Sequence, residues 1–303
     1  DTEHYSYSDL TSEIYLNSGG LDFSVGGSQK MGEPGNFTGT FTASVKVLYE
    51  KLDFAFEMLE EILLRSKLTD EKRLGEILDE TMSRARMRLE NSSHSSAAMR
   101  AASYYSPLSS FYDRTGGIGF YQFLEKITER CSKEEGYRLK LGKKLMEVAK
   151  TLFTASNMTV SYTADEEGYG RLPAALAAFK AVLPEGNGIR YPYEFKPELK
   201  NEGFRTASQV NYVACCGTFG ESAYTGALKV LKVILNYEYL WVNLRVKGGA
   251  YGCMSSFGRN GETMLVSYRD PKLGETNRVY EGIPEYLRTF SIDDRDMTKY
   301  VIG

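Results

Sequence analysis

The stretch RVKGGAYGC, residues 245–253, holds the residues of this sequence that are best suited to chemistry. Arg245 carries a permanent positive charge with forked N–H donors, and Tyr251, six positions later, offers a neutral hydroxyl donor. Between them stand Gly248 and Gly249, which would let another backbone approach closely. Fixed donors of this kind stabilise negative charge on an oxygen. The stretch is therefore a candidate substrate-binding or catalytic site.

The same two side chains also have a structural interpretation. Arg245 could complement the negative end of a preceding helix, and Tyr251 could be a half-buried strand aromatic with a satisfied hydroxyl. Spacing alone favours this interpretation, because most such residues support the fold. Another observation is needed to favour chemistry.

Metal ligands and reactive thiols are poorly represented. The two histidines, His4 and His94, lie in polar, Ser-rich settings, so we expect surface positions rather than metal ligands. The four cysteines form no CxxC pair, and adjacent Cys215 and Cys216 should point to opposite faces of a strand as small packed side chains. We therefore predict no metal site in this chain, and reduced thiols in a cytoplasmic protein.

Composition excludes several classes of function. Hydrophobic residues make up 42% and charged residues 25%, which is typical of a folded globular protein. The net charge of -3 is spread over 37 basic and 40 acidic residues, so we expect no nucleic-acid partner. The N-terminus is acidic and polar, and no apolar run reaches membrane-spanning length, so we expect no membrane association.

The first part of the chain predicts strands followed by helices. Alternating Leu21, Phe23 and Val25 and residues 41–47 predict two strands with one buried face. Thr69 looks like a helix N-cap. Apolar periodicity predicts helices over 52–63, 74–89, 118–131 and 134–153, then a strand over 158–163 and an Ala-rich helix that ends near residue 183.

A Pro- and Gly-rich stretch then predicts a linker over 184–205, after which the pattern restarts. We expect a strand over 209–215, a helix over 228–241 and a hairpin with a type I′ turn at Asn260-Gly261. A helix over 274–288 and the start of another follow, so the second part looks unfinished.

Both parts share the order helix, Gly-Gly, strand, in EIYLNSGGLDFSV and in LRVKGGAYGCMSSF. The first copy has no matching Arg and Tyr pair, so we assign Gly19-Gly20 a turn role only. The fold class predicted is α+β, with duplicated α/β units whose antiparallel sheets pack against helices.

The second phrase resembles the pitrilysin and insulinase family of zinc metallopeptidases, and most closely its presequence-protease branch. In that branch an arginine at a helix end and a tyrosine six positions later, separated by Gly-Gly, precede a hairpin, as Arg245 and Tyr251 do here. The resemblance extends through SSFGRNGETMLVSYRDPKLGETNRVYEGIPEYL and YSYSDLTSEIYLNSGGLDFSV, and so covers essentially the whole chain. It implies four homologous α/β units, with an H-x-x-E-H zinc site in the first.

By this resemblance, residues 1–183 would be a third, non-catalytic unit that lacks its opening strand, and 206–303 the front of a fourth. Neither histidine belongs to H-x-x-E-H, so zinc would be bound by an N-terminal half and not by this chain. The resemblance implies a substrate-binding C-terminal half of a peptidase that degrades peptides in a closed chamber. Tyr251 and Arg245 would then stabilise the oxyanion, with Gly248 and Gly249 against the substrate.

Two other functions stay open. The chain could belong to a catalytically inactive homologue that acts as a scaffold or partner subunit. It could also be an unrelated α+β binding module. Arg245 and Tyr251 favour the peptidase, because a scaffold has no chemical need for the pair.

Overall fold

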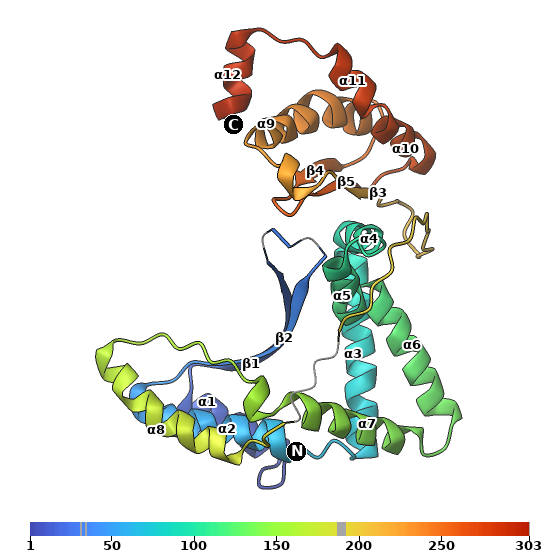
Figure 1. Ribbon diagram of the computed structural model, residues 1–303. Coiled ribbons are helices and arrows are strands. Elements are labelled where there is room, and N and C mark those ends of the chain that lie inside the picture. Colours follow the sequence, from blue (N-terminus) through green and yellow to red (C-terminus); the bar gives the residue numbers. More distant parts are fainter. Residues whose placement is uncertain (31, 34, 187–191, 303) are drawn as a thin grey trace. The chain divides into compact units, whose positions relative to one another are not determined.

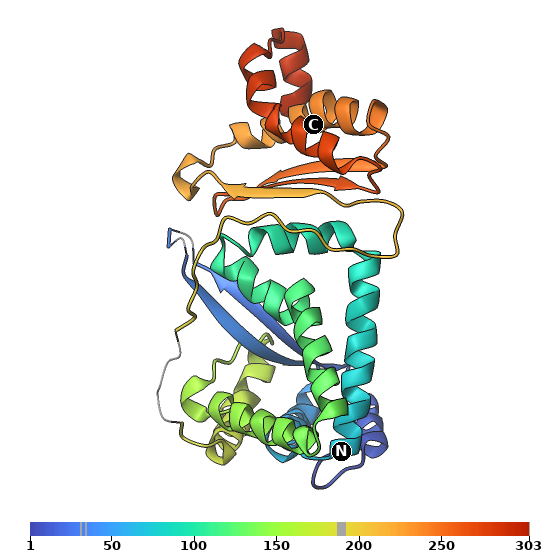
Figure 2. The same ribbon diagram turned by 90° about the vertical axis from the view of Figure 1, so that its right-hand side faces the viewer.

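The computed structural model describes residues 1–30, 32–33, 35–186 and 192–302 (Figures 1 and 2). The chain forms two compact units whose segments alternate along the sequence. Unit 1 comprises Asp1–Gly26, Thr40–Met82 and Leu124–Pro192, and unit 2 comprises Gly27–Gly39, Ser83–Phe123 and Tyr193–Gly303. None of the described helices is long and apolar enough to span a bilayer.

Unit 1 is built from helices around a two-stranded sheet. Strands β1 (Leu21–Gln29) and β2 (Phe37–Val45) pair with each other, and residues 27–29 and 37–39 of these strands belong to unit 2. Its helices are α1 (Tyr7–Asn17), η1 (Tyr49–Lys51), α2 (Leu52–Arg65), the first part of α3 (Glu71–Asn91), most of α6 (Ile118–Lys133), α7 (Tyr137–Leu152), η2 (Ala155–Asn157) and α8 (Glu166–Val182).

The core of unit 1 follows from the periodicity of α2. This helix buries Leu52, Ala55 and Leu59 at spacings of three and four residues, which places them on one face. Leu59 clusters with Phe179 and Leu183, against which apolar residues of both strands pack. The predicted helices of this unit are thus confirmed.

Three details of unit 1 differ from expectation. Val25 is 51% exposed and Phe41 42%, so the apolar face of the strands is only partly buried. Residues 158–163 form no strand, because no described strand pairs with them. Asp70, rather than Thr69, caps α3, since its carboxylate accepts the N–H of Arg73 at 2.9 Å.

Unit 2 contains a three-stranded antiparallel sheet covered by helices. The strand order is β3 (Ala214–Thr218), β5 (Glu262–Tyr268), β4 (Gly252–Phe257). Helix α4 (Ser93–Ala102) lies on one face, and α9 (Ala227–Ile234) with the π-helix η4 (Leu235–Val246) on the other (Figures 1 and 2). The remaining helices are α5 (Pro107–Gly116), η3 (Glu221–Ala223), α10 (Leu273–Glu281), α11 (Ile283–Thr289) and α12 (Asp294–Ile302). The α+β class with antiparallel sheets against helices is confirmed.

The core of unit 2 depends on η4. Its buried residues Leu235, Leu240 and Leu244 are spaced by five and four, because a π-helix bonds residue i to i+5. They cluster with Val213, which directly precedes β3, and with Tyr280 of α10. This packing fixes the end of η4 against the sheet.

The hairpin is confirmed, but its turn is not type I′. That turn needs positive φ at both central residues, whereas of the pair Asn260-Gly261 only Gly261, at 78°, has it. The loop instead runs from Gly258 to Gly261, closed by the Gly258 N–H donating to the Glu262 carbonyl at 2.8 Å. Strand β3 also begins later than predicted, and the helix expected over 274–288 is two helices that meet at Gly282.

The predicted linker has no helix or strand in its described residues, and residues 187–191 lie outside them. Glu202 nevertheless binds Arg100, which also donates to buried Asp113 at 2.7 Å. Hydrogen bonds from Arg100 and then Tyr104 outweigh burial and lower the pKa of Glu202 to about 2. The predicted assignment of 1–183 and 206–303 to homologous units stays a prediction, since compact packing does not test homology.

Candidate functional site

The structure brings Arg245 and Tyr251 together at the end of η4. The last π-turn closes with the Lys247 N–H donating to the Val242 carbonyl at 3.0 Å. The chain then folds back, with the Gly249 N–H on the Arg245 carbonyl at 3.0 Å. As a result the Arg245 guanidinium donates to the Tyr251 backbone carbonyl and lies 5.2 Å from the centre of the Tyr251 ring.

Arg245 is held mainly by aromatic rings. Its guanidinium carbon is 4.4 Å from the Trp241 ring, one α-like step back along η4, which is a favourable cation–π distance. Among the described residues no carboxylate forms an ion pair with it. The charge of Arg245 is therefore not neutralised by the described part of the chain.

Tyr251 has a fixed backbone and an exposed side chain. Its N–H donates to the carbonyls of Tyr268 at 3.0 Å and Arg269 at 3.3 Å, just before β4 begins. The residue is 62% exposed, and its hydroxyl bonds to none of the described residues. Tyr251 is therefore exposed and not half-buried, and its catalytic role stays a prediction.

The two glycines are required by the backbone itself. A Cβ on Gly248 would lie 2.5 Å from the Leu244 carbonyl oxygen and 2.9 Å from that of Asn243. Gly249 has a φ of 86°, which side chains other than hydrogen rarely allow. A substrate-binding role for Gly248 and Gly249 stays a prediction.

The cysteines are unsuited to nucleophilic chemistry, and all four are free. Burial raises the pKa of Cys253 to about 11, although the nearby Arg245 charge lowers it somewhat. Burial likewise raises the pKa of Cys216 to about 12, and that of Cys215. These three thiols are protonated at neutral pH, and the thiolate is the reactive form.

The histidines lie apart from any metal-binding group. His4 is exposed but its Nδ1 lies 2.9 Å from the buried carboxylate of Glu61. His94 is half-buried, edge-to-face with the Tyr268 ring at 5.0 Å, so the expected surface position is wrong for it. Within the described ranges no group of three or more His, Cys, Asp or Glu residues could hold a metal ion.

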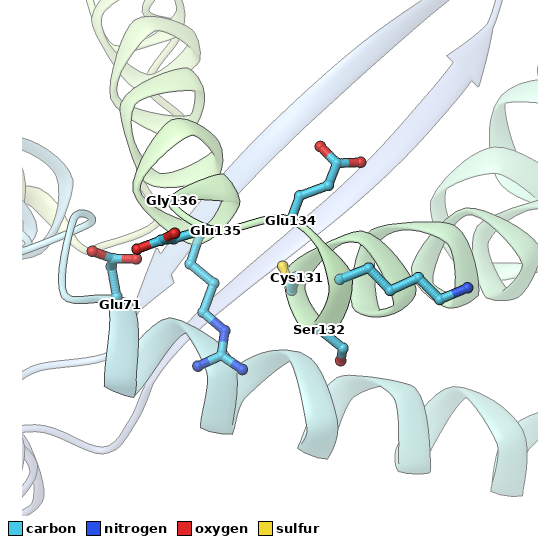
Figure 3. A pocket seen from close by; sticks show the side chains of 8 residues that line it. Glu71, Cys131, Ser132, Glu134, Glu135 and Gly136 are labelled. Carbon is cyan, nitrogen blue, oxygen red and sulfur yellow. The ribbon is translucent and has the colours of Figure 1, made fainter.

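Two pockets in the described part of the chain lie elsewhere. One, of about 590 Å³, is open and mostly polar, and Figure 3 shows its labelled residues at the start of α3, at the end of α6 and in the connection to α7. Its Glu71, Glu134 and Glu135 surround it with negative charge beside Lys133 and Arg138. The other, of about 330 Å³, lies between α4, α5 and the unit 2 sheet. Neither is lined by Arg245 or Tyr251, so the candidate site is an exposed surface of unit 2.

Sequence reasoning missed three neighbours of this site. Trp241 stacks on Arg245, and Tyr268 and Arg269 border Tyr251 from the end of β5. Trp241 could have been predicted as a neighbour of Arg245, because residues four positions apart on a helix lie side by side. The other two are brought close by the pairing of β4 with β5, which the hairpin prediction implied without fixing its register.

Comparison with known proteins identifies the family. Residues 1–127 match the family model described as Peptidase M-16C associated, and residues 201–303 match the PreP C-terminal domain. Protein HypA of Clostridium perfringens is 33% identical over 304 residues, which are 100% of this chain and 31% of that protein. Presequence protease 1 of Arabidopsis thaliana is 28% identical over 263 residues, or 85% of this chain and 24% of that protein.

The fold also matches a solved structure. The periplasmic protease PqqL from Escherichia coli has a TM-score of 0.53 over 99% of this chain and 31% of its own, at 15% identity. The chain thus spans about a third or less of each of these proteins. Because the two family models together cover most of its residues, this chain belongs to the pitrilysin/insulinase family of peptidases, in its presequence-protease-like branch.

Proposed function

We propose that this chain is the substrate-binding, C-terminal part of a zinc-dependent peptidase that degrades peptides in a closed chamber. The described residues offer no zinc ligand set, so the metal would be held by an N-terminal half of the same protein. The partners of this chain are then that half and the peptide substrate. Taken alone, the chain is expected to have no peptidase activity.

The observation that carries this proposal is the state of Tyr251. Its ring and backbone are held by Arg245, yet its hydroxyl is exposed and bonded to none of the described residues. A donor that is fixed beforehand and has no partner in the protein is what stabilisation of a developing oxyanion requires. Arg245 adds a permanent charge beside it, which strengthens binding of a carbonyl oxygen as its negative charge grows.

In this function each residue has a distinct task. Tyr251 donates its hydroxyl hydrogen to the substrate oxygen, and Arg245 orients Tyr251 through the backbone carbonyl while contributing charge. The glycines let the chain reverse direction within a few residues of the helix end. The substrate would therefore lie over a surface whose main chain is already rigid.

The test is Tyr251→Phe in the full-length peptidase that contains this chain. The change removes one hydroxyl and almost no volume, so the fold should persist while kcat falls by about 10² to 10³, the range for loss of one oxyanion donor. Tyr237→Phe is the matched control, because Tyr237 lies on η4 and is 65% exposed. It should leave kcat unchanged.

A kcat of Tyr251→Phe within about threefold of wild type, well below the oxyanion range, would contradict the proposal. The peptidase would then use Tyr251 for packing only. A parent protein with no activity at all would instead support the scaffold function.

A further inference from the structure

Arg269, directly after β5, has an unusual backbone. Its φ is 49°, and it is the one residue other than glycine with positive φ in the described part of the chain. Left-handed backbone is unfavourable for a side chain as large as that of arginine. Such conformations persist where the surrounding structure enforces them, and they cluster at functional sites.

The surroundings of Arg269 do enforce it. The next residue, Asp270, is 1% exposed, and its carboxylate accepts the Lys272 N–H at 2.8 Å and the Thr276 hydroxyl at 2.6 Å. Its backbone exchanges two hydrogen bonds with Asn211, at 2.7 and 2.9 Å. The chain that follows Arg269 is therefore fixed by both its main chain and a buried side chain.

In this conformation both the backbone carbonyl and the guanidinium of Arg269 lie next to Tyr251. Its carbonyl accepts the Tyr251 N–H at 3.3 Å, and its guanidinium carbon lies 5.9 Å from the Tyr251 ring centre. The same guanidinium is 5.5 Å from the ring of Tyr268. Arg245 lies 5.2 Å from the Tyr251 ring, so two guanidinium groups contact one exposed phenol. Neither guanidinium is in an ion pair with a described carboxylate.

We propose that Arg269 is a positioning residue for Tyr251. An exposed tyrosine would otherwise exchange among side-chain rotamers, and cation–π contacts from two arginines restrict that exchange. Arg269 thus holds the phenol where its hydroxyl meets the substrate oxygen, without touching the substrate itself. This inference rests on the proposed role of Tyr251.

The alternative is that Arg269 merely ends a strand. A turn residue with positive φ is improved by glycine, so under that alternative Arg269→Gly is at least as stable as wild type and fully active. A positioning role predicts that stability and activity change in opposite directions. Arg269→Gly therefore separates the two.

The experiment uses the full-length peptidase and measures thermal unfolding and steady-state kinetics. We expect Arg269→Gly to unfold at the wild-type temperature or above it, and higher than Arg269→Ala, which keeps the backbone strain. Its kcat should fall about tenfold, while KM stays within about twofold, because the substrate keeps its own contacts. Arg269→Lys retains the cation and should recover part of kcat.

Arg259→Ala is the matched control, since Arg259 is exposed in the loop at the other end of the same hairpin. It should change neither quantity. In a Tyr251→Phe background, Arg269→Gly should lower kcat by less than about twofold, because both changes act on one group.

The possible failures are distinguishable. Normal kcat in Tyr251→Phe overturns the proposed function. Low kcat in Tyr251→Phe together with normal kcat in Arg269→Gly overturns only the role of Arg269. A lower unfolding temperature together with lower kcat in Arg269→Gly also overturns it, because both changes then follow from a damaged fold.

Discussion

The two helix–Gly-Gly–strand phrases of this chain share a backbone design but differ in side chains. In the first, α1 leads through Gly19-Gly20 into β1, and in the second, η4 leads through Gly248-Gly249 into β4. The second glycine of each pair has positive φ, 132° at Gly20 and 86° at Gly249. In both, the Gly-Gly pair lets the chain leave a helix and enter a strand within a few residues.

The side chains around the glycines are different. Three residues before the first glycine stands Leu16 in one phrase and Arg245 in the other. The residue two positions after the second glycine is Asp22 in the first phrase and Tyr251 in the second. Leu16 is 75% exposed and does not pack in the core of unit 1. It is therefore not a structural equivalent of Arg245. The turn therefore forms without the cation–phenol pair, which supports a chemical rather than a structural role for that pair.

The largest effect should come from removing the cation of the second phrase. In the full-length peptidase, Arg245→Ala removes a charge near the substrate oxygen and the support of Tyr251, so kcat/KM should fall by roughly 10³ or more. KM should also rise, since a guanidinium holds a ground-state carbonyl as well. Leu16→Ala, the matching change in the first phrase, should leave both within about twofold, as is usual for exposed positions.

Combining Arg245→Ala with Tyr251→Phe should cost less than the sum of the single losses in activation free energy, because both groups act on one oxygen. Equal losses for Leu16→Ala and Arg245→Ala would remove the distinction between the phrases.

The next largest effect should be on the acid stability of unit 1, which contains the first phrase. Burial alone would raise the pKa of Glu61, but hydrogen bonds from His4, then Thr2 and Arg65, lower it to about 2 from 4.5. A carboxyl with a lowered pKa stabilises the fold above its ordinary pKa, and this stability is lost as pH falls from about 4.5 to about 2. At neutral pH the contribution is on the order of 3 kcal/mol.

Glu61→Gln should therefore lower the free energy of unfolding of unit 1 at pH 7 and flatten its dependence on pH below 5. Helix content followed by circular dichroism measures this change. The single tryptophan, Trp241, reports on the second phrase, and its fluorescence at pH 7 should not change. A matched control is Glu202→Gln, which should alter the acid response of unit 2 instead, because the pKa of Glu202 is also about 2. An unaltered acid response in Glu61→Gln would count against the contact with His4.

The smallest of these effects concerns the first glycine of each pair. Gly248→Ala places a Cβ 2.5 Å from the backbone oxygen of Leu244, which cannot move away without breaking the helix end. Gly19→Ala meets the flexible Lys46 side chain at 3.3 Å and the Lys46 carbonyl oxygen at 3.5 Å, which is an ordinary van der Waals distance. We expect a loss of about 1–3 kcal/mol in unfolding free energy for Gly248→Ala and less than about 0.5 kcal/mol for Gly19→Ala. Chemical denaturation measures both, and equal losses would show that the turns are packed alike.

Many helices of this chain were predictable, because their apolar residues recur with a helical period, as Leu52, Ala55 and Leu59 do, but α4 and α5 were not predicted. The strand expected over 158–163 was not formed, because alternation of side chains does not supply a partner strand. The hairpin was placed correctly, but Asn260-Gly261 could not show that the loop spans four residues.

At the candidate site, Arg245 and Tyr251 were identified from spacing and resemblance, and the structure shows them in contact. The exposure of Tyr251 was not predictable, since a tyrosine has an apolar ring suited to burial and a polar hydroxyl suited to the surface. Arg269 was also beyond reach, because a positive φ at arginine leaves no trace in residue type. The backbone conformation of Arg269 depends on the hydrogen bonds between Asp270 and Asn211, which lie far apart in the chain.

The π-helix η4 has a consequence for how this region is aligned with its relatives. A π-turn holds more residues than an α-turn, so a helix of the same length in space contains extra residues when it is wound this way. Where the homologous helix of a relative is purely α-helical, the sequence alignment would need a gap before Arg245. Without that gap, Arg245 would be aligned with a residue that is not its structural equivalent. Counting backward from the Gly-Gly pair reduces this shift, because only Val246 and Lys247 separate Arg245 from Gly248.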